Sequence, residues 1–183
     1  MPRSSSSSSI HLRETPRCDV SVQFTTARRG VPHPAALRRW AQSAFGIKPV
    51  TTALRRSLRE GAAISIRIVG AAESRRLNRA WRGKDKPTNV LSFPSGLNGA
   101  SYGSGAGDAD SPYPLGDLVI CAPVVAREAR EQSKIPQAHW AHMVVHGVLH
   151  LLGYDHEVDK DADIMEAREI TLLANLGYLN PYA

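Results

Sequence analysis

The sequence predicts an α+β domain built from a small mixed β-sheet and several helices. Ile64, Ile66 and Ile68 alternate with Ser65 and Arg67, which is the period of a strand with one face in the core. Residues 138–152 are apolar on every helical face except one stripe of histidines, the pattern of a buried helix. Strand and helix segments are mixed without strict alternation, which indicates the α+β class.

The first half of the chain is expected to hold two strands and three helices. The strands are residues 20–25 and the segment around Ile66, and the first helix starts at Pro34 with apolar residues at three- and four-residue spacing. A second helix is predicted over residues 53–60, where Gly61 ends it. The third follows Gly70, and its apolar face is formed by Leu77, Ala80 and Trp81.

The second half is expected to hold two strands and three helices. The strands are a short one at residues 90–93 and a buried one at 118–121. The helices are predicted from Pro123 to about residue 132, from Pro136 to Gly153, and over about 160–176 with Gly177 at its end. Residues 95–111 are rich in Gly, Ser, Asn and Asp, so a mobile loop, longer than usual and close to a substrate, is expected.

Length and composition predict one ordered domain after an N-terminal tail. Residues 1–17 are rich in serine and are expected to be disordered, which leaves 18–183 as a single domain. The two cysteines, Cys18 and Cys121, have no C-x-x-C spacing, so a reducing, cytoplasmic location is expected. No apolar stretch approaches the ~20 residues that a membrane helix needs, so no membrane span is expected.

Charge is distributed unevenly along the chain. Residues 1–90 hold 18 lysines and arginines against 5 acidic residues, whereas residues 91–183 hold 5 against 12. If the basic half forms one face, a polyanion such as RNA is the natural partner, because neutralising phosphates releases counterions. A solvated basic surface explains the charge equally well.

Three histidines have the spacing of a metal site. His146 and His150 are one helical turn apart, so both imidazoles can reach a single ion. Gly153 allows the chain to reverse and to bring His156 back as a third ligand. Three protein ligands leave the fourth zinc position open, as in catalytic sites, so the sequence predicts one Zn²⁺ on the buried helix and the turn after it.

Other residues near this motif are assigned to supporting roles or to none. The H-x3-H-x5-H spacing is shared with the metzincin proteases, but their catalytic glutamate is replaced here by Gly147. His139 and His142 are expected to be hydrogen-bonded groups rather than ligands. His142 is expected to help orient a metal ligand without binding the metal itself. Asp155 is either a second orienting group or a turn residue.

Two segments of the chain resemble the YbeY family of ribosome-associated endoribonucleases. They are residues 146–156, HGVLHLLGYDH, and residues 81–94, WRGKDKPTNVLSFP; LGDL at 115–118 and AHM at 141–143 match as well. The resemblance spans about residues 20–182. It implies an α+β metal-dependent endoribonuclease domain with zinc on the three histidines. It also implies cleavage of single-stranded RNA, 16S ribosomal RNA 3′-end maturation and ribosome quality control, with the small ribosomal subunit and its proteins as partners.

The resemblance also assigns a role to Arg82, the family's functionally important arginine. A guanidinium offers a planar, permanently charged fork for a phosphate. The neighbouring cations that could guide the RNA backbone are Arg75, Arg76, Arg79, Lys84 and Lys86. The departures from the family pattern are Trp81, where tyrosine is common, the loop after Phe93 and the N-terminal tail.

Two other functions are compatible with the residues. One is a ribosome-binding protein in which zinc only stabilises the fold, and the other, opposed by Gly147, is a metalloprotease. The sequence leaves open whether water or the RNA's own 2′-hydroxyl attacks. It also leaves open the cleavage position, the oligomeric state and the metal used in the cell, since nickel and copper bind imidazoles too.

Overall fold

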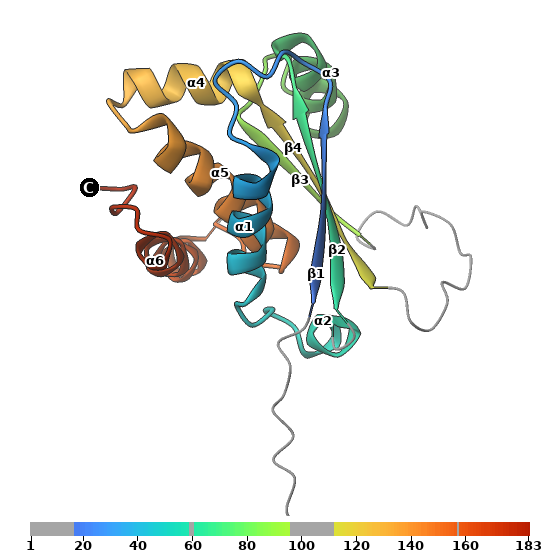
Figure 1. The fold of residues 1–183 in the computed structure, drawn as a ribbon. Coiled ribbons are helices and arrows are strands. Elements are labelled where there is room, and N and C mark those ends of the chain that lie inside the picture. The colour runs from blue at the N-terminus through green and yellow to red at the C-terminus, as the bar shows by residue number, and fades with distance from the viewer. Residues whose placement is uncertain (1–16, 59–60, 96–111, 157) are drawn as a thin grey trace, which may run out of the picture.

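In the part of the chain that the structure describes, four strands form one mixed sheet in the order β1-β2-β4-β3 (Figure 1). The computed structural model describes residues 17–58, 61–95, 112–156 and 158–183. Within them the strands are β1 (Cys18–Phe24), β2 (Ala62–Val69), β3 (Val90–Pro94) and β4 (Tyr113–Cys121). β1, β2 and β4 run parallel, and β3 pairs antiparallel with β4 at one edge. The small mixed sheet that the sequence predicted is therefore confirmed.

The central strand β2 has the predicted alternation, whereas β4 is longer than predicted. Ile64, Ile66 and Ile68 are buried on one face of β2. β4 begins at Tyr113 rather than near residue 118, because it pairs with β2 along that strand's whole length, with one bulge between Ala63 and Ile64. Pairing with a neighbour, not local apolar content, decides where this strand starts.

Within the described residues, six helices accompany the sheet. They are α1 (Pro34–Phe45), α2 (Thr52–Ser57), α3 (Ala71–Arg82), α4 (Ala122–Glu131), α5 (Pro136–Leu151) and α6 (Asp159–Asn175). Each lies close to a predicted helix, and the α+β class is confirmed. Gly153 and Gly177, which the sequence placed at helix ends, have φ of 91° and 85°, values that favour glycine.

The sheet has helices on both faces. α1 and α5 pack on one face, and α6 packs on the outer side of α5 (Figure 1). The main core between these helices and the sheet includes Leu37, Trp40, Leu118, Val144 and Leu149. A smaller core on the opposite face, around Val119 and Cys121, is covered by α3 and α4. α5 is therefore in contact with the sheet and with three helices, α1, α4 and α6.

The predicted apolar face of α3 is only partly correct. Leu77 packs on the smaller core, but Trp81 is 59 % exposed. The buried side chains of this helix are polar, Ser74 and Asn78, because they bind the backbone of the segment that follows. Ser74 Oγ donates to the Thr88 carbonyl at 2.8 Å, and Asn78 Nδ2 donates to the Lys86 carbonyl at 2.7 Å.

Two predicted segments lie almost wholly outside the described residues. They are the tail, of which only Arg17 is described, and the loop at 95–111, of which only Ser95 is described. The end of the helix predicted over 53–60 also falls outside, since residues 59 and 60 are not described. Among the described residues, no helix combines the length and apolar character needed to cross a membrane.

Candidate metal centre

The metal candidates project from α5, the most buried helix. Eleven of its residues are buried, including His139 and His142, while His146 and His150 are half-buried toward its C-terminal end. The helix stops at Leu151, and Gly153 starts the turn that leads to His156. Helix and turn together bring three histidines from separate positions to one place.

The rings of His146, His150 and His156 converge. Their centroids are 4.6 Å apart for His146 and His150, 4.9 Å for His150 and His156, and 5.5 Å for His146 and His156. One ring nitrogen of each lies within 4.8 Å of those of the other two, close enough to share an ion. The three residues that the sequence singled out are therefore brought together.

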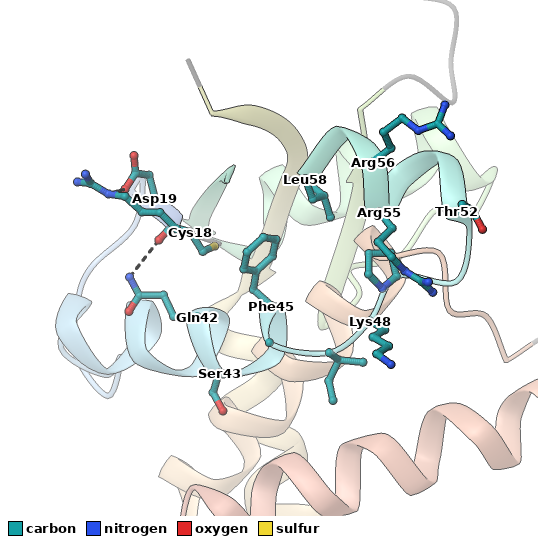
Figure 2. A pocket seen from close by; sticks show the side chains of 14 residues that line it. Cys18, Asp19, Gln42, Ser43, Phe45, Lys48, Thr52, Arg55, Arg56 and Leu58 are labelled. Atoms are coloured by element: carbon teal, nitrogen blue, oxygen red, sulfur yellow. Dashed lines mark hydrogen bonds and ion pairs between the residues drawn. The ribbon is translucent and has the colours of Figure 1, made fainter. Parts of the chain in front are cut away.

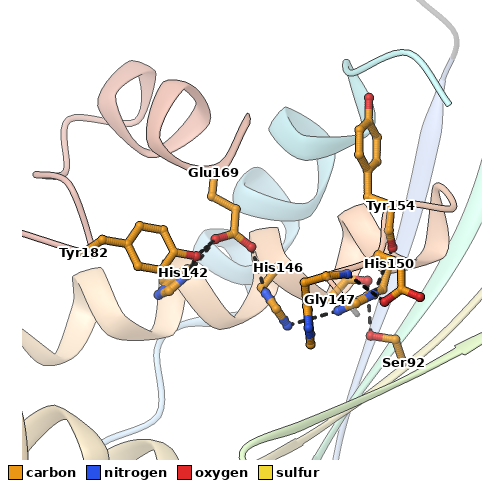
Figure 3. A network of polar contacts seen from close by, with 10 residues as sticks. Ser92, His142, His146, Gly147, His150, Tyr154, Glu169 and Tyr182 are labelled. Atoms are coloured by element: carbon orange, nitrogen blue, oxygen red, sulfur yellow. Dashed lines mark hydrogen bonds and ion pairs between the residues drawn. The ribbon is translucent and has the colours of Figure 1, made fainter. Parts of the chain in front are cut away.

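Hydrogen bonds fix which nitrogens of two rings face the centre. His146 Nδ1 lies 2.7 Å from Glu169 Oε1, and His150 Nδ1 lies 3.0 Å from the Tyr154 carbonyl oxygen (Figure 3). Both partners only accept, so both Nδ1 atoms must carry the proton. In a neutral imidazole the Nε2 atom is then a lone-pair acceptor.

These two Nε2 atoms lie close together. His146 Nε2 and His150 Nε2 are 3.2 Å apart, a distance at which two unprotonated nitrogens repel unless a cation or a proton lies between them. Two nitrogen ligands on a tetrahedral zinc ion with ordinary bond lengths are about 3.3 Å apart. The donor set therefore fits a zinc ion bound to Nε2 of both rings, with His156 as the third ligand.

Burial and its neighbours keep His150 neutral. Burial lowers its pKa first, and the nearby His146 and His156 lower it further, to about 4. Asp155 and the hydrogen bond to the Tyr154 carbonyl act in the opposite direction without reversing the result. A neutral imidazole at neutral pH is the form that binds a metal.

Glu169, on α6, is the carboxylate behind the centre. Its side chain is fully buried and accepts from His146 and from His142 Nε2 at 3.0 Å (Figure 3). Burial raises its pKa, but the hydrogen bonds from His142 and His146 outweigh this and bring the pKa to about 2. Glu169 is thus an ionised buried group, and no lysine or arginine in the described part of the chain pairs with it.

Tyr182 donates the third hydrogen bond to Glu169. Its hydroxyl contacts Oε2, the oxygen that also accepts from His142. Burial raises the pKa of Tyr182, and the hydrogen bond to Glu169 raises it further, so the hydroxyl stays protonated. A bound cation at His146 would balance the charge of this carboxylate, which no lysine or arginine in the described part of the chain pairs with.

The remaining orienting candidates have different positions. His142 reaches His146 through Glu169 rather than directly. His139 Nε2 lies 3.1 Å from Glu128, which also accepts from Asn89, in a separate network. Asp155 accepts from the backbone N–H of His156 at 2.7 Å, which fixes the turn, and it makes no hydrogen bond to a ligand ring among the described residues.

Gly147 packs directly against the sheet. A Cβ atom there would lie 2.8 Å from Leu118 Cδ2 and 3.4 Å from Ser92 Oγ. Ser92 Oγ also donates to the Gly147 carbonyl oxygen at 3.2 Å (Figure 3). A side chain at the position where a metzincin protease carries its glutamate would therefore require the buried Leu118 to shift.

The basic residues predicted for RNA lie at the end of α3 and just after it. Arg79 and Arg82 occupy the last turn of α3, and both are exposed, as are Lys84 and Lys86. None of these four forms a salt bridge within the described residues. Arg75 differs, because its guanidinium is bound to Asp85 by contacts of 2.9 and 2.6 Å.

A large cavity lies at a different place. About 1030 Å³ in volume, it opens between α1, α2 and the start of β1, with Lys48 and Arg55 on its wall (Figure 2). None of the described histidines lines it. Lys48 connects its wall to the turn after α5, because the Lys48 carbonyl accepts from the Tyr154 hydroxyl at 2.9 Å. The volume of a cavity alone would therefore not identify the histidine cluster as the candidate site.

Sequence reasoning missed Glu169. The signal available was its position, because Met165, Leu172 and Leu173 flank it at helical spacing and all three are buried. A glutamate on the apolar face of a helix requires a buried partner. Which partner it has depends on how α6 packs on α5, and no local pattern contains that information.

Comparison with known proteins identifies a matching family and several similar proteins that share its description. The sequence model of the family described as "Endoribonuclease YbeY" matches residues 22–177. A protein of that name from Alkalilimnicola ehrlichii is 50 % identical over 173 residues, covering 93 % of this chain and 95 % of the relative. Those from Stenotrophomonas maltophilia and Xanthomonas euvesicatoria are 49 % and 48 % identical, each covering 91 % of this chain and 94 % of the relative.

A solved structure shares the fold. The solution structure of a Thermotoga maritima protein superposes with a TM-score of 0.50 at 22 % identity. The match covers 86 % of this chain and 88 % of that protein.

Proposed function

The chain belongs to the YbeY family of endoribonucleases, RNA-cleaving hydrolases, and from that premise we propose that it is a zinc-dependent enzyme specific for single-stranded RNA. We further propose 16S ribosomal RNA 3′-end maturation and ribosome quality control as its role, with the small ribosomal subunit and its proteins as partners. Such a role would place its action in the cytoplasm.

One observation carries the metal dependence. His146 and His150 present two Nε2 lone pairs 3.2 Å apart, because their Nδ1 protons are already donated to Glu169 and Tyr154. Zinc is favoured because all three candidate ligands are imidazoles. When bound, it would act as a Lewis acid toward a phosphate oxygen. It would thereby stabilise the negative charge that develops on that oxygen during phosphodiester cleavage.

The protein's own groups would hold and orient this site. Glu169 fixes the ring of His146, and the Tyr154 carbonyl fixes the ring of His150. His142 supports the first of these contacts by donating to Glu169 as well, whereas Asp155 shapes the turn that carries His156. We assign positioning roles to these residues because each acts through a ligand or through the backbone next to one.

We assign phosphate binding to Arg82. Its guanidinium is exposed in the last turn of α3 and forms no ion pair within the described residues, so its fork is free for an anion. Arg79, Lys84 and Lys86 would add cations along the same path, whereas Arg75 would first have to leave Asp85. A backbone path of this kind contributes affinity without reading sequence.

The test is cleavage of single-stranded RNA by the purified full-length chain, before chelation, after it and after zinc is returned. We expect activity and bound zinc to fall together and to recover together, and His150→Ala to lose both. His33→Asn is the matched control, since His33 caps α1 and Asn caps equally well. Full activity in fully chelated protein, or in zinc-free His150→Ala, would refute the metal dependence.

Product analysis separates the two nucleophiles. A 2′,3′-cyclic phosphate end would show attack by the RNA's own 2′-hydroxyl, and its absence from the first product would show attack by water. Casein in place of RNA tests the protease alternative, which the packing at Gly147 opposes.

A further inference from the structure

Trp81 is a large aromatic side chain on the surface. It is 59 % exposed, whereas the other two tryptophans, Trp40 and Trp140, are 0 % and 2 % exposed. Its ring makes an edge contact with Phe93, with centroids 5.7 Å apart and planes at 70°. An indole with this exposure keeps much of its surface free for a ligand.

The indole is held on a rigid support. Trp81 lies in the last turn of α3, which Gly83 ends with a φ of 66° and a hydrogen bond to the Arg79 carbonyl. Asn78 binds the Lys86 carbonyl, so the segment after the helix is tied back to it. A ring on such a support loses little conformational entropy when a ligand stacks on it.

The surroundings of Trp81 are cationic. Arg79, Arg82 and Lys84 are exposed close to it in sequence, and none has a salt bridge within the described residues. Asp85, an acid close to it in sequence, is paired with Arg75. An aromatic face beside free cations is the combination that binds single-stranded nucleic acid, since the bases stack and the phosphates pair.

Trp81 is connected to the metal centre across one strand. Phe93 contacts its ring on the α3 side of β3, and the preceding Ser92 faces the other way and donates to the Gly147 carbonyl of α5. Gly147 follows the ligand His146 directly. β3 lies at one edge of the sheet that the described residues form.

We propose that Trp81 is the stacking platform for an unpaired base of the RNA substrate. The proposal rests on the proposed function and adds a reason for preferring single strands. A base inside a duplex has both faces covered by its neighbours, whereas an unpaired base is free to stack on the indole. The cations favour this occupant over an apolar protein surface, which would have to desolvate them.

Fluorescence can report this contact selectively, because Trp40 and Trp140 are buried. The metal-free protein is titrated with a single-stranded oligoadenylate of about ten nucleotides, with the same backbone lacking bases, and with a duplex. We expect the oligoadenylate to quench the exposed tryptophan and the abasic strand and the duplex to quench it far less. Equal quenching by the abasic strand would overturn the proposal.

Variants test the energetic contribution. Trp81→Leu is expected to weaken binding of end-labelled oligoadenylate, measured by anisotropy, by roughly 5- to 150-fold, which corresponds to one stacked base. Trp81→Phe should keep most of the affinity. In cleavage assays of the zinc-loaded protein, Trp81→Leu should raise KM with little change in kcat. Leu179→Ala is the control, because it removes an 87 % exposed apolar side chain elsewhere.

The outcomes separate this proposal from the proposed function. Wild-type-like affinity in Trp81→Leu, with cleavage and zinc dependence intact, would overturn the stacking role alone. An equal loss in Leu179→Ala would also overturn it, since the effect would then be unspecific. A wild-type protein that binds no oligonucleotide in the anisotropy assay would overturn both.

Discussion

The Oε1 atom of Glu169 lies 2.7 Å from Nδ1 of His146, a residue 23 positions earlier in the chain. This contact leaves the far nitrogen, Nε2, as the unprotonated atom that can bind a metal, and it fixes the orientation of the ring. The carboxylate is itself held by His142 and Tyr182, so its position does not depend on a bound ion. α6 and the C-terminal segment therefore shape a candidate metal site whose three histidines all lie in α5 and the segment after it.

Glu169→Gln should weaken zinc binding about ten- to hundred-fold. The amide keeps the size of the side chain but has no charge, and its NH₂ group cannot accept from His142, His146 or Tyr182. Competition with a chelator of known affinity measures the effect. Glu166→Gln on the exposed side of α6 is the control. Unchanged zinc affinity in Glu169→Gln would show that the carboxylate does not orient the ligand.

Arg82→Glu should abolish RNA cleavage and leave bound zinc and the fold intact. The guanidinium is exposed and outside the histidine cluster, so reversing its charge repels the phosphate without removing a ligand. Arg130→Glu is a matched control, since Arg130 also lies in the last turn of a helix, where replacing a cation by an anion is equally unfavourable for the interaction with the helix dipole. Cleavage at the wild-type rate by Arg82→Glu would remove Arg82 from the mechanism.

The metal-free protein should lose stability on acidification in two steps. His150 has a pKa of about 4 in the folded chain against an ordinary 6.5, so only the unfolded chain takes up this proton between those values. Glu169, at about 2 against 4.5, adds the second loss below pH 4.5. In both cases the unfolded state binds more protons, so the free energy of unfolding falls as the pH falls.

Urea unfolding of the chelated protein across this pH range measures both steps. His150→Gln should flatten the first step, because the residue that gains a proton on unfolding is gone. If the urea midpoint stays constant or rises as the pH is lowered from 6.5 to 4, the depressed pKa of His150 is contradicted.

The sequence predicted the parts of this molecule that are encoded locally. The alternation at Ile64, Ile66 and Ile68 gave the core strand, and the spacing of His146, His150 and His156 gave the histidine cluster. Both follow from the geometry of a single element and the turn next to it.

What the sequence could not give depends on how elements pack together. The role of Glu169 requires the placement of α6 on α5, and the exposure of Trp81 requires that Ser74 and Asn78 take the inner face of α3. The start of β4 is set by its pairing with β2. Each of these is a contact between segments far apart in the chain.

Gly147→Glu restores the residue that a metzincin protease carries after its first histidine, and we expect it to destabilise the protein rather than create a protease. The new side chain would start 2.8 Å from Leu118 Cδ2 and would bury a carboxylate beside the sheet. Overpacking and burial of the charge together should cost at least about 3 kcal/mol.

Chemical denaturation measures this cost, with Gln137→Glu as the control that adds the same charge at an exposed position of α5. Casein hydrolysis tests the gained activity. A stable Gly147→Glu protein that cleaves casein would show that the helix can move away from Ser92 and Leu118. Since Ser92 binds the Gly147 carbonyl and Leu118 belongs to the main core, we expect neither to yield.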